Sequence, residues 1–218
     1  MRIITGFNLR IILAAMAGFA VLGAPVSLAS AEDDDVVAEA VEKVSPEAFV
    51  DELVEKLRVL AGGDVDEDTR VDQLRSVLAE DMAVRRLQRY LLSKEQRKAL
   101  SKEDVSQYNE VFPRYISTAL AGSIDQLVTR EIKVFDVIER RPGDFIVSSN
   151  LYSDTGEKRA RIDWRVQESR GKKQLTDVMI DGASTNVDRR AQFTAIIKKD
   201  GFPALLAHMK EVAGDPVS

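Results

Sequence analysis

Few side chains in this sequence of 218 residues are suited to catalysis. The chain has no Cys and a single His, His208, so nucleophile–base relays and transition-metal sites lack their usual members. Asp163 and Asp177 are the best carboxylate pair for acid–base chemistry, because both are expected on neighbouring strands. The structural alternative is that they pair with nearby arginines such as Arg161 and Arg165. We therefore predict no catalytic site, no metal site and no cofactor, and keep an enzyme that uses one of these carboxylates as the alternative.

Two acidic segments have the composition of cation sites but not the spacing. The run Glu32-Asp33-Asp34-Asp35 lies in an expected tail, where one flexible segment offers no fixed geometry. The segment Asp64–Thr69 begins like a calcium loop. However, Thr69 stands where the sharp-turn glycine belongs, and Arg75 stands where the bidentate glutamate belongs. We interpret the first segment as a solvated tail and the second as a turn with a helix cap.

The charge of the chain argues against a nucleic-acid partner. Without Arg2 and Arg10, which lie in an expected signal peptide, 29 basic residues remain against 36 acidic ones, a net charge of about −7. Nucleic-acid binding depends on Lys and Arg side chains that neutralise phosphates. Arg85, Arg86 and Arg89 nevertheless form a basic patch on an expected helix. This patch suits a lipid head group or an acidic partner, and a solvated helix face is the simpler interpretation.

Residues 1–31 have the pattern of a secretory signal peptide. Arg2 and Arg10 give a positive start, residues 11–22 are apolar apart from one glycine, and Ala29-Ser30-Ala31 offers a small-x-small cleavage site. A membrane anchor is the alternative, but so short an apolar run does not span a bilayer comfortably. We therefore expect export through the secretory pathway and removal of this segment.

Residues 45–213 are expected to form a single domain, after a flexible leader over residues 32–44. Apolar residues at helical spacing make the first half of this domain helical. Helices are expected from Pro46 to the Gly62-Gly63 pair, from Thr69 to Leu92 with a break near Glu80-Asp81, from Ser93 to Leu100, and from Val105 onward with a bend or break at Pro113.

The chain then changes to a pattern typical of strands. Expected strands cover residues 129–139, residues 145–152 and the two arms of a hairpin around Ser169–Lys172. In the second arm, alternation places Val178 and Ile180 on one face, opposite Leu175. Short turns between all four strands predict an antiparallel meander.

This order of elements predicts an α+β fold. We expect a four-stranded antiparallel curved sheet, wrapped by the N-terminal helices and by two C-terminal helices over residues 186–199 and 203–212. Helices and a sheet face that do not meet at full packing density enclose an apolar cavity. Periodicity leaves open whether side chains or a ligand fill that space, so a structural adaptor with a fully packed core is one alternative.

The second half of the chain contains a specific series of motifs. Asp163-Trp164-Arg165-Val166 forms an aromatic strand, and Asp177-Val178-Met179-Ile180-Asp181-Gly182-Ala183-Ser184 ends the next one. A helix follows, with Arg190-Ala191-Gln192-Phe193 near its start and Asp200-Gly201 at its end. This series resembles the MlaC family of exported phospholipid-binding proteins, also called toluene-tolerance proteins.

The resemblance implies a periplasmic shuttle that carries one phospholipid and uses no catalytic group. Its partners in the family are an outer-membrane lipoprotein complex and an inner-membrane ABC transporter complex with a periplasmic lipid-binding subunit. The route maintains outer-membrane lipid asymmetry. A sister branch is associated with hopanoid biosynthesis, so a hopanoid or another lipid is the alternative cargo.

On this basis we predict that a lipid lies against apolar side chains from both halves of the chain. The predicted lining residues are Leu53, Leu57, Tyr108, Phe112, Ile116, Val134, Val147, Leu151, Ile162, Trp164, Val166, Val178, Ile180, Phe193, Ile197 and Leu205.

Overall fold

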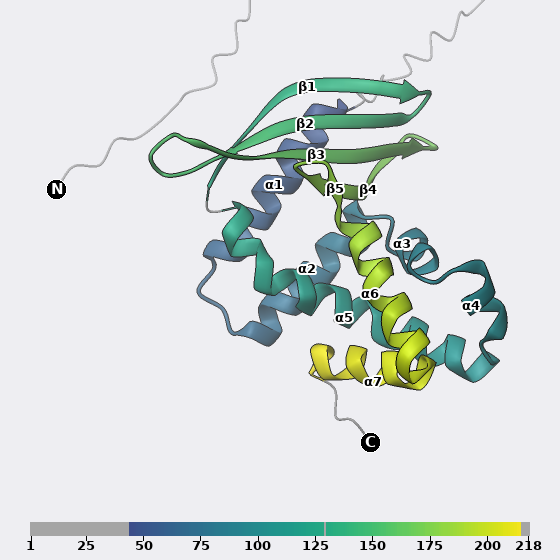
Figure 1. The fold of residues 1–218 in the computed structure, drawn as a ribbon. Coiled ribbons are helices and arrows are strands. Elements are labelled where there is room, and N and C mark those ends of the chain that lie inside the picture. Colours follow the sequence, from purple (N-terminus) through teal and green to yellow (C-terminus); the bar gives the residue numbers. More distant parts are fainter. Residues whose placement is uncertain (1–43, 129, 215–218) are drawn as a thin grey trace, which may run out of the picture. The chain divides into compact units, whose positions relative to one another are not determined.

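The structure, a computed structural model, describes residues 44–128 and 130–214 (Figure 1). The expected signal peptide, and all but the last residue of the expected leader, lie outside these described residues. Within them, no helix combines the length and the apolar composition needed to cross a membrane.

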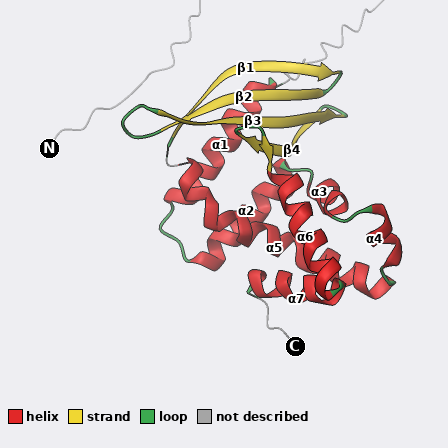
Figure 2. Ribbon diagram, viewed as in Figure 1, coloured by secondary structure: helices red, strands yellow, loops and turns green. Residues whose placement is uncertain are grey.

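Helices come first in the described chain, a sheet follows, and two further helices end it. In order, the elements are α1 (Pro46–Gly62), α2 (Glu67–Asp81), α3 (Val84–Leu91), α4 (Lys94–Ala99), α5 (Lys102–Val128), β1 (Glu131–Arg141), β2 (Asp144–Tyr152), β3 (Lys158–Ser169), β4 (Lys172–Ile180), β5 (Ala183–Ser184), α6 (Thr185–Asp200) and α7 (Phe202–Ala213). Figure 2 shows the strands gathered in one sheet, with the helices on one side of it. The predicted α+β fold is confirmed.

The starts of the first helices follow from local side-chain chemistry. Ser45 caps α1, because its Oγ accepts a hydrogen bond from the N–H of Ala48 over 3.0 Å. Asp66 caps α2 in the same way, accepting from the N–H of Thr69 over 2.9 Å. The segment Asp64–Thr69 therefore contains a helix cap, as the sequence indicated.

The predicted break between α2 and α3 is a strand-like connection. α2 ends at Asp81, and α3 begins at Val84. Between them, Met82 forms a parallel bridge with Leu175, and the N–H of Ala83 donates to the carbonyl of Leu175 over 3.0 Å. A backbone that pairs with a strand cannot continue a helix, because each N–H is used only once. The edge of β4 thus ends α2 and fixes the start of α3.

α5 continues through Pro113 as one helix of 27 residues. Pro113 has no N–H to donate to the carbonyl of Asn109, four residues earlier. Ser117 donates its hydroxyl hydrogen to the carbonyl of Pro113 over 2.8 Å. The helix is not broken at Pro113, and a bend at this position stays a prediction.

The sheet is an antiparallel meander in the order β1-β2-β3-β4-β5. Trp164, in β3, pairs with Val147 of β2 and Val178 of β4. The prediction of four strands is corrected to five, because Ala183–Ser184 pairs with the end of β4. This fifth strand has two residues, which is too short to show an alternating pattern in a sequence.

A bulge in β4 changes which residues face the core. Arg165 pairs with Asp177 and Val166 pairs with Leu175, so Thr176 is an extra residue in β4. Alternation had placed Leu175 opposite Val178. The bulge instead turns Leu175 into the core, where it is buried.

The interior consists of two clusters of buried apolar residues. The helical cluster joins side chains of α2, α3, α5, α6 and α7, with Phe112 and Phe193 fully buried. The sheet cluster packs α1 against β2, β3 and β4 around Trp164. Leu57 and Met82 pack against both clusters, so the boundary between the two clusters passes α1 and the α2–α3 connection.

Candidate functional site

A cleft of about 1380 Å³ opens between the helices and one end of the sheet. Its walls come from α2, α3, α4 and α5, and from the ends of β3 and β4 next to their shared turn. Its apolar lining residues include Leu78, Met82, Val84, Leu100, Tyr108 and Ile116. A large cleft with an apolar wall suits a ligand that has extensive apolar surface.

Hydrogen bonds hold α3 against α5 in the wall of the cleft. The hydroxyl of Tyr108 donates to the carbonyl of Gln88 over 2.9 Å. The side-chain amide of Gln88 donates to Oδ1 of Asn109, also over 2.9 Å. Burial raises the pKa of Tyr108 far above its usual range, so its hydroxyl stays protonated and remains a donor. These bonds fix the spacing of the two helices.

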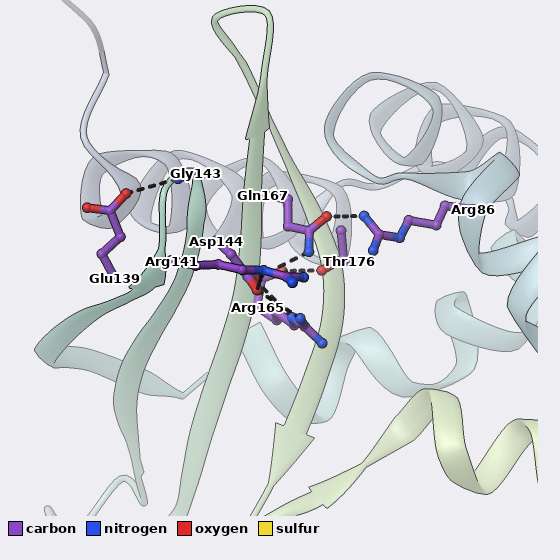
Figure 3. Close-up of polar contacts among 8 residues, drawn as sticks. All are labelled: Arg86, Glu139, Arg141, Gly143, Asp144, Arg165, Gln167 and Thr176. Carbon is purple, nitrogen blue, oxygen red and sulfur yellow. Dashed lines mark hydrogen bonds and ion pairs between the residues drawn. The ribbon is translucent and has the colours of Figure 1, made fainter.

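A polar network joins the sheet to α3 at the rim of the cleft (Figure 3). Arg165 donates from Nε to Oδ1 of Asp144 over 3.0 Å and from Nη2 to Oδ2 over 2.9 Å. Arg141 adds a bond from Nε to Oδ2 over 3.0 Å. Gln167 donates to Oδ1 of Asp144 over 3.3 Å and accepts a hydrogen bond from Arg86. Because Arg86 and Gln167 line the cleft, the network connects its rim to a buried carboxylate.

Asp144 is ionised in this network although its side chain is buried. The hydrogen bond from Arg165 lowers the pKa of the Asp144 carboxyl well below its usual range and outweighs the effect of burial. The bulged residue Thr176 donates its hydroxyl hydrogen to the carbonyl of Arg165 over 3.0 Å. At the β1–β2 turn, the N–H of Gly143 donates to the carboxylate of Glu139 over 2.9 Å (Figure 3). Hydrogen bonds of this network and of the β1–β2 turn therefore connect β1, β2, β3 and β4.

The two carboxylates considered for catalysis are held by structural partners. Asp163 accepts hydrogen bonds from Oγ of Ser148 over 2.6 Å and from Nε of Arg161 over 2.9 Å. Asp177 accepts from Oγ of Ser184 over 2.6 Å. Neither carboxylate lines the cleft. Among the described residues, no group of three or more His, Cys, Asp and Glu side chains is placed to hold a metal ion.

The structure divides the predicted lining residues between the cleft and the two clusters. Tyr108 and Ile116 line the cleft and also belong to the helical cluster. The sheet cluster contains Leu53, Val147, Leu151, Ile162, Trp164 and Val166, with Val134 and Val178 packed against it. The helical cluster contains Phe112, Phe193 and Leu205, with Ile197 packed against it. Leu57 packs against both clusters, and Ile180 is 36% exposed. Contact of this set with a ligand stays a prediction.

Apart from the basic patch of Arg85, Arg86 and Arg89, sequence reasoning did not select the cleft residues around the α2–α3 connection. The expected helix break near Glu80-Asp81 was the available signal. A segment that leaves a helix to pair with a strand separates this helix from the next one, and the cleft lies beside this segment. Gln167 and Thr176 gave no such signal, since polar residues on strands are ordinarily solvated.

A solved structure has the same fold. It is the phospholipid-binding protein from Ralstonia solanacearum, determined in complex with a phospholipid, and it matches with a TM-score of 0.59. The match covers 77% of this chain and 96% of that chain at 19% sequence identity. At this identity the likeness shows the fold alone.

Sequence comparison assigns the family. A search of curated proteins found no match. A family model described as MlaC protein matches residues 47–211, which is most of the chain. The motifs between Asp163 and Gly201 had indicated the same family. The chain therefore belongs to the MlaC family.

Proposed function

We propose that this chain is an exported lipid carrier that holds one phospholipid in the cleft. The cleft itself carries the proposal, because its volume of about 1380 Å³ exceeds the range of about 300–1,000 Å³ typical of sites for drug-sized ligands. The Ralstonia protein of the same fold was solved with a phospholipid bound.

A carrier must offset the cost of moving acyl chains out of a bilayer. At about 0.8 kcal/mol per CH₂, a lipid with about 30 methylenes would lose on the order of 24 kcal/mol in water. The apolar wall around Leu78, Met82 and Ile116 replaces water along part of the chains. Because Met82 also packs against both clusters, we place the remaining chain length along the boundary between them.

Binding and transport require no catalytic group. Asp163 and Asp177 are engaged by Arg161, Ser148 and Ser184, and both lie outside the lining of the cleft. This arrangement supports a carrier over an enzyme that uses either carboxylate.

Family membership supports the route on which the carrier acts. We propose that it moves phospholipid between an outer-membrane lipoprotein complex and an inner-membrane ABC transporter complex with a periplasmic lipid-binding subunit, and so maintains outer-membrane lipid asymmetry. The pattern of residues 1–31 supports export to the periplasm. N-terminal sequencing of the periplasmic protein should begin at Glu32, and a retained Met1 would contradict cleavage.

Native mass spectrometry of the mature protein from its own periplasm tests the carrier. We expect an adduct with the mass of one phospholipid. Met82→Asp and Leu100→Asp should each remove it, because a carboxylate in the apolar wall would lose its hydration against acyl chains. Val59→Asp is the matched control, since Val59 is 65% exposed and lies outside the cleft lining.

The outcomes separate the alternatives. A hopanoid adduct would keep the carrier and change its cargo. A wild-type protein without any lipid, or folded cleft variants that retain the adduct, would contradict the proposal. Circular dichroism establishes that each variant is folded.

A further inference from the structure

The cleft concentrates positive charge in an acidic protein. Five arginines are among its lining residues, namely Arg75, Arg85, Arg86, Arg89 and Arg97. No Asp or Glu is among the described residues that line it. The complete sequence, by contrast, has more acidic than basic residues. The positive lining is therefore a local property of the cleft.

Most of this charge is not neutralised by carboxylates. Arg75 forms an ion pair with Asp72. Arg86 donates to the neutral amide of Gln167, and Arg97 donates to the carbonyl of Arg89 over 2.6 Å. In the described part of the chain, the side chains of Arg85 and Arg89 have no hydrogen bond and no ion pair.

The position of Arg85 on α3 opposes helix stability, whereas Arg89 lies in the last turn, where the helix dipole favours a cation. Arg85 and Arg89 are four residues apart, so their side chains are neighbours on the helix surface, where like charges repel. Arg85 and Arg86 also lie in the first turn, where the helix dipole favours negative groups. The sequence of α3, VRRLQRYL, contains no acidic residue that would relieve either effect. A bound anion would relieve both.

The same cleft combines these cations with an apolar wall. Arginine binds phosphate oxygens through paired N–H groups, which makes it suited to a phosphodiester. Leu78, Met82 and Ile116 lie in the same lining and suit acyl chains. A ligand that satisfies both parts is an amphiphile with an anionic head, whereas an acidic protein surface would leave the apolar wall uncovered.

We propose that Arg85 and Arg89 bind the phosphate of the lipid head group and make the carrier prefer lipids with a net negative head group over zwitterionic lipids. This inference rests on the proposed carrier function. It adds a head-group site and a class of cargo to it.

Loading from mixed vesicles measures the preference directly. The mature protein is incubated with vesicles that contain equal parts of phosphatidylglycerol and phosphatidylethanolamine with identical acyl chains. The lipids bound to the protein are then extracted and quantified by mass spectrometry. Because both lipids come from one vesicle, any change in vesicle docking affects them equally. We expect wild-type protein to hold phosphatidylglycerol over phosphatidylethanolamine by about tenfold, because both lipids offer a phosphate but the arginines of the cleft repel the ammonium group of phosphatidylethanolamine.

A pair of charge-matched variants isolates the site. Arg85→Gln with Arg89→Gln should reduce the ratio to about one, so that whatever lipid is bound consists of the two species in similar amounts. Arg130→Gln with Arg140→Gln removes the same charge at exposed positions outside the cleft and should keep the wild-type ratio.

The remaining outcomes overturn one proposal or the other. A wild-type protein without preference, or a first double variant that keeps it, overturns the head-group site while the carrier stands. A wild-type protein that takes no lipid from these vesicles overturns the carrier itself. Calorimetry with inorganic phosphate distinguishes the source of the anion. Tight phosphate binding that depends on Arg85 and Arg89, without a lipid preference, would assign the site to a free anion and overturn the lipid head group.

Discussion

Arg165 holds Asp144 by two parallel hydrogen bonds, from Nε to Oδ1 over 3.0 Å and from Nη2 to Oδ2 over 2.9 Å. The pair joins β2 to β3 at the rim of the cleft. Asp144→Asn removes the charge that pairs with Arg165, and we expect the free energy of unfolding at pH 7 to fall by roughly 2–3 kcal/mol. Urea denaturation measures it, with Asp154→Asn in an exposed turn as the control. Equal losses in the two variants would contradict a special role for the pair.

The contribution of Asp144 should depend on pH. An aspartate in the unfolded chain has a pKa of about 3.9. In the fold, the hydrogen bond from Arg165 lowers the pKa of Asp144 below that value. Stabilisation is therefore complete above about pH 4 and is lost as the pH falls toward the folded-state pKa. We expect the stability difference between wild type and Asp144→Asn to shrink in urea titrations below pH 4. A constant difference down to pH 2 would contradict the lowered pKa.

Tyr108→Phe tests the link between α3 and α5. The change leaves the carbonyl of Gln88 without the hydroxyl that bonds to it, so we expect a loss of about 1 kcal/mol in stability. Tyr90→Phe is the control, because the side chain of Tyr90 is 39% exposed. Since burial raises the pKa of Tyr108, absorbance titration should also show at least one tyrosine that ionises only when the protein unfolds at high pH. Ionisation of all four tyrosines near pH 10 in the folded protein would refute this.

Alanine substitutions at two glycines distinguish the effect of backbone strain from the effect of a steric clash. Gly143 and Gly156 both have positive φ, 74° and 80°, so alanine at either position is strained by about 1–2 kcal/mol. A Cβ at Gly143 would lie 2.9 Å from the carbonyl oxygen of Glu168, whereas a Cβ at Gly156 meets nothing within 4 Å. Gly143→Ala should therefore lower the thermal unfolding temperature more than Gly156→Ala. Equal shifts would mean that the β1–β2 turn relaxes away from β3.

The single tryptophan reports how far the lipid extends. Trp164 is buried in the sheet cluster, where its indole N–H donates to Oγ of Ser149 over 2.9 Å, and it is not among the residues that line the cleft. We expect phospholipids with brominated acyl chains to load and to quench its fluorescence only weakly, because the chains would lie beside the sheet cluster and not inside it. Strong quenching would place acyl chains against the sheet core, as the sequence-based lining set predicted.

The fold was predictable where local chemistry decides it. Ser45 and Asp66 cap their helices with side chains whose role is evident from sequence, and the strand pattern gave the meander. Thr176 was not predictable in this way, because a bulge depends on pairing with β3 rather than on any property of the residue. The two-residue β5 carries too little pattern to be recognised.

The candidate site was predictable only in part, for a physical reason. Burial and ligand contact demand the same apolar residues, so alternation and helical stripes cannot distinguish Trp164, which is buried away from the cleft, from Ile116, which is equally buried but lies at the wall of the cleft. The basic patch of Arg85, Arg86 and Arg89 was visible in the sequence. The fold shows that these charges line the same cleft as several apolar side chains. The described residues that line this cleft include no carboxylate.

The pairing of Met82 and Ala83 with β4 also protects the sheet against self-association. An uncovered edge strand offers free backbone N–H and C=O groups to another chain. On one side of the described sheet, β4 is covered by this connection and by β5. The opposite edge is β1, whose sequence EIKVFDVIERR carries charged residues along its length, which disfavour pairing with a second copy. The two edges are thus protected differently: backbone pairing satisfies part of the edge of β4, and charged side chains along β1 disfavour aggregation there.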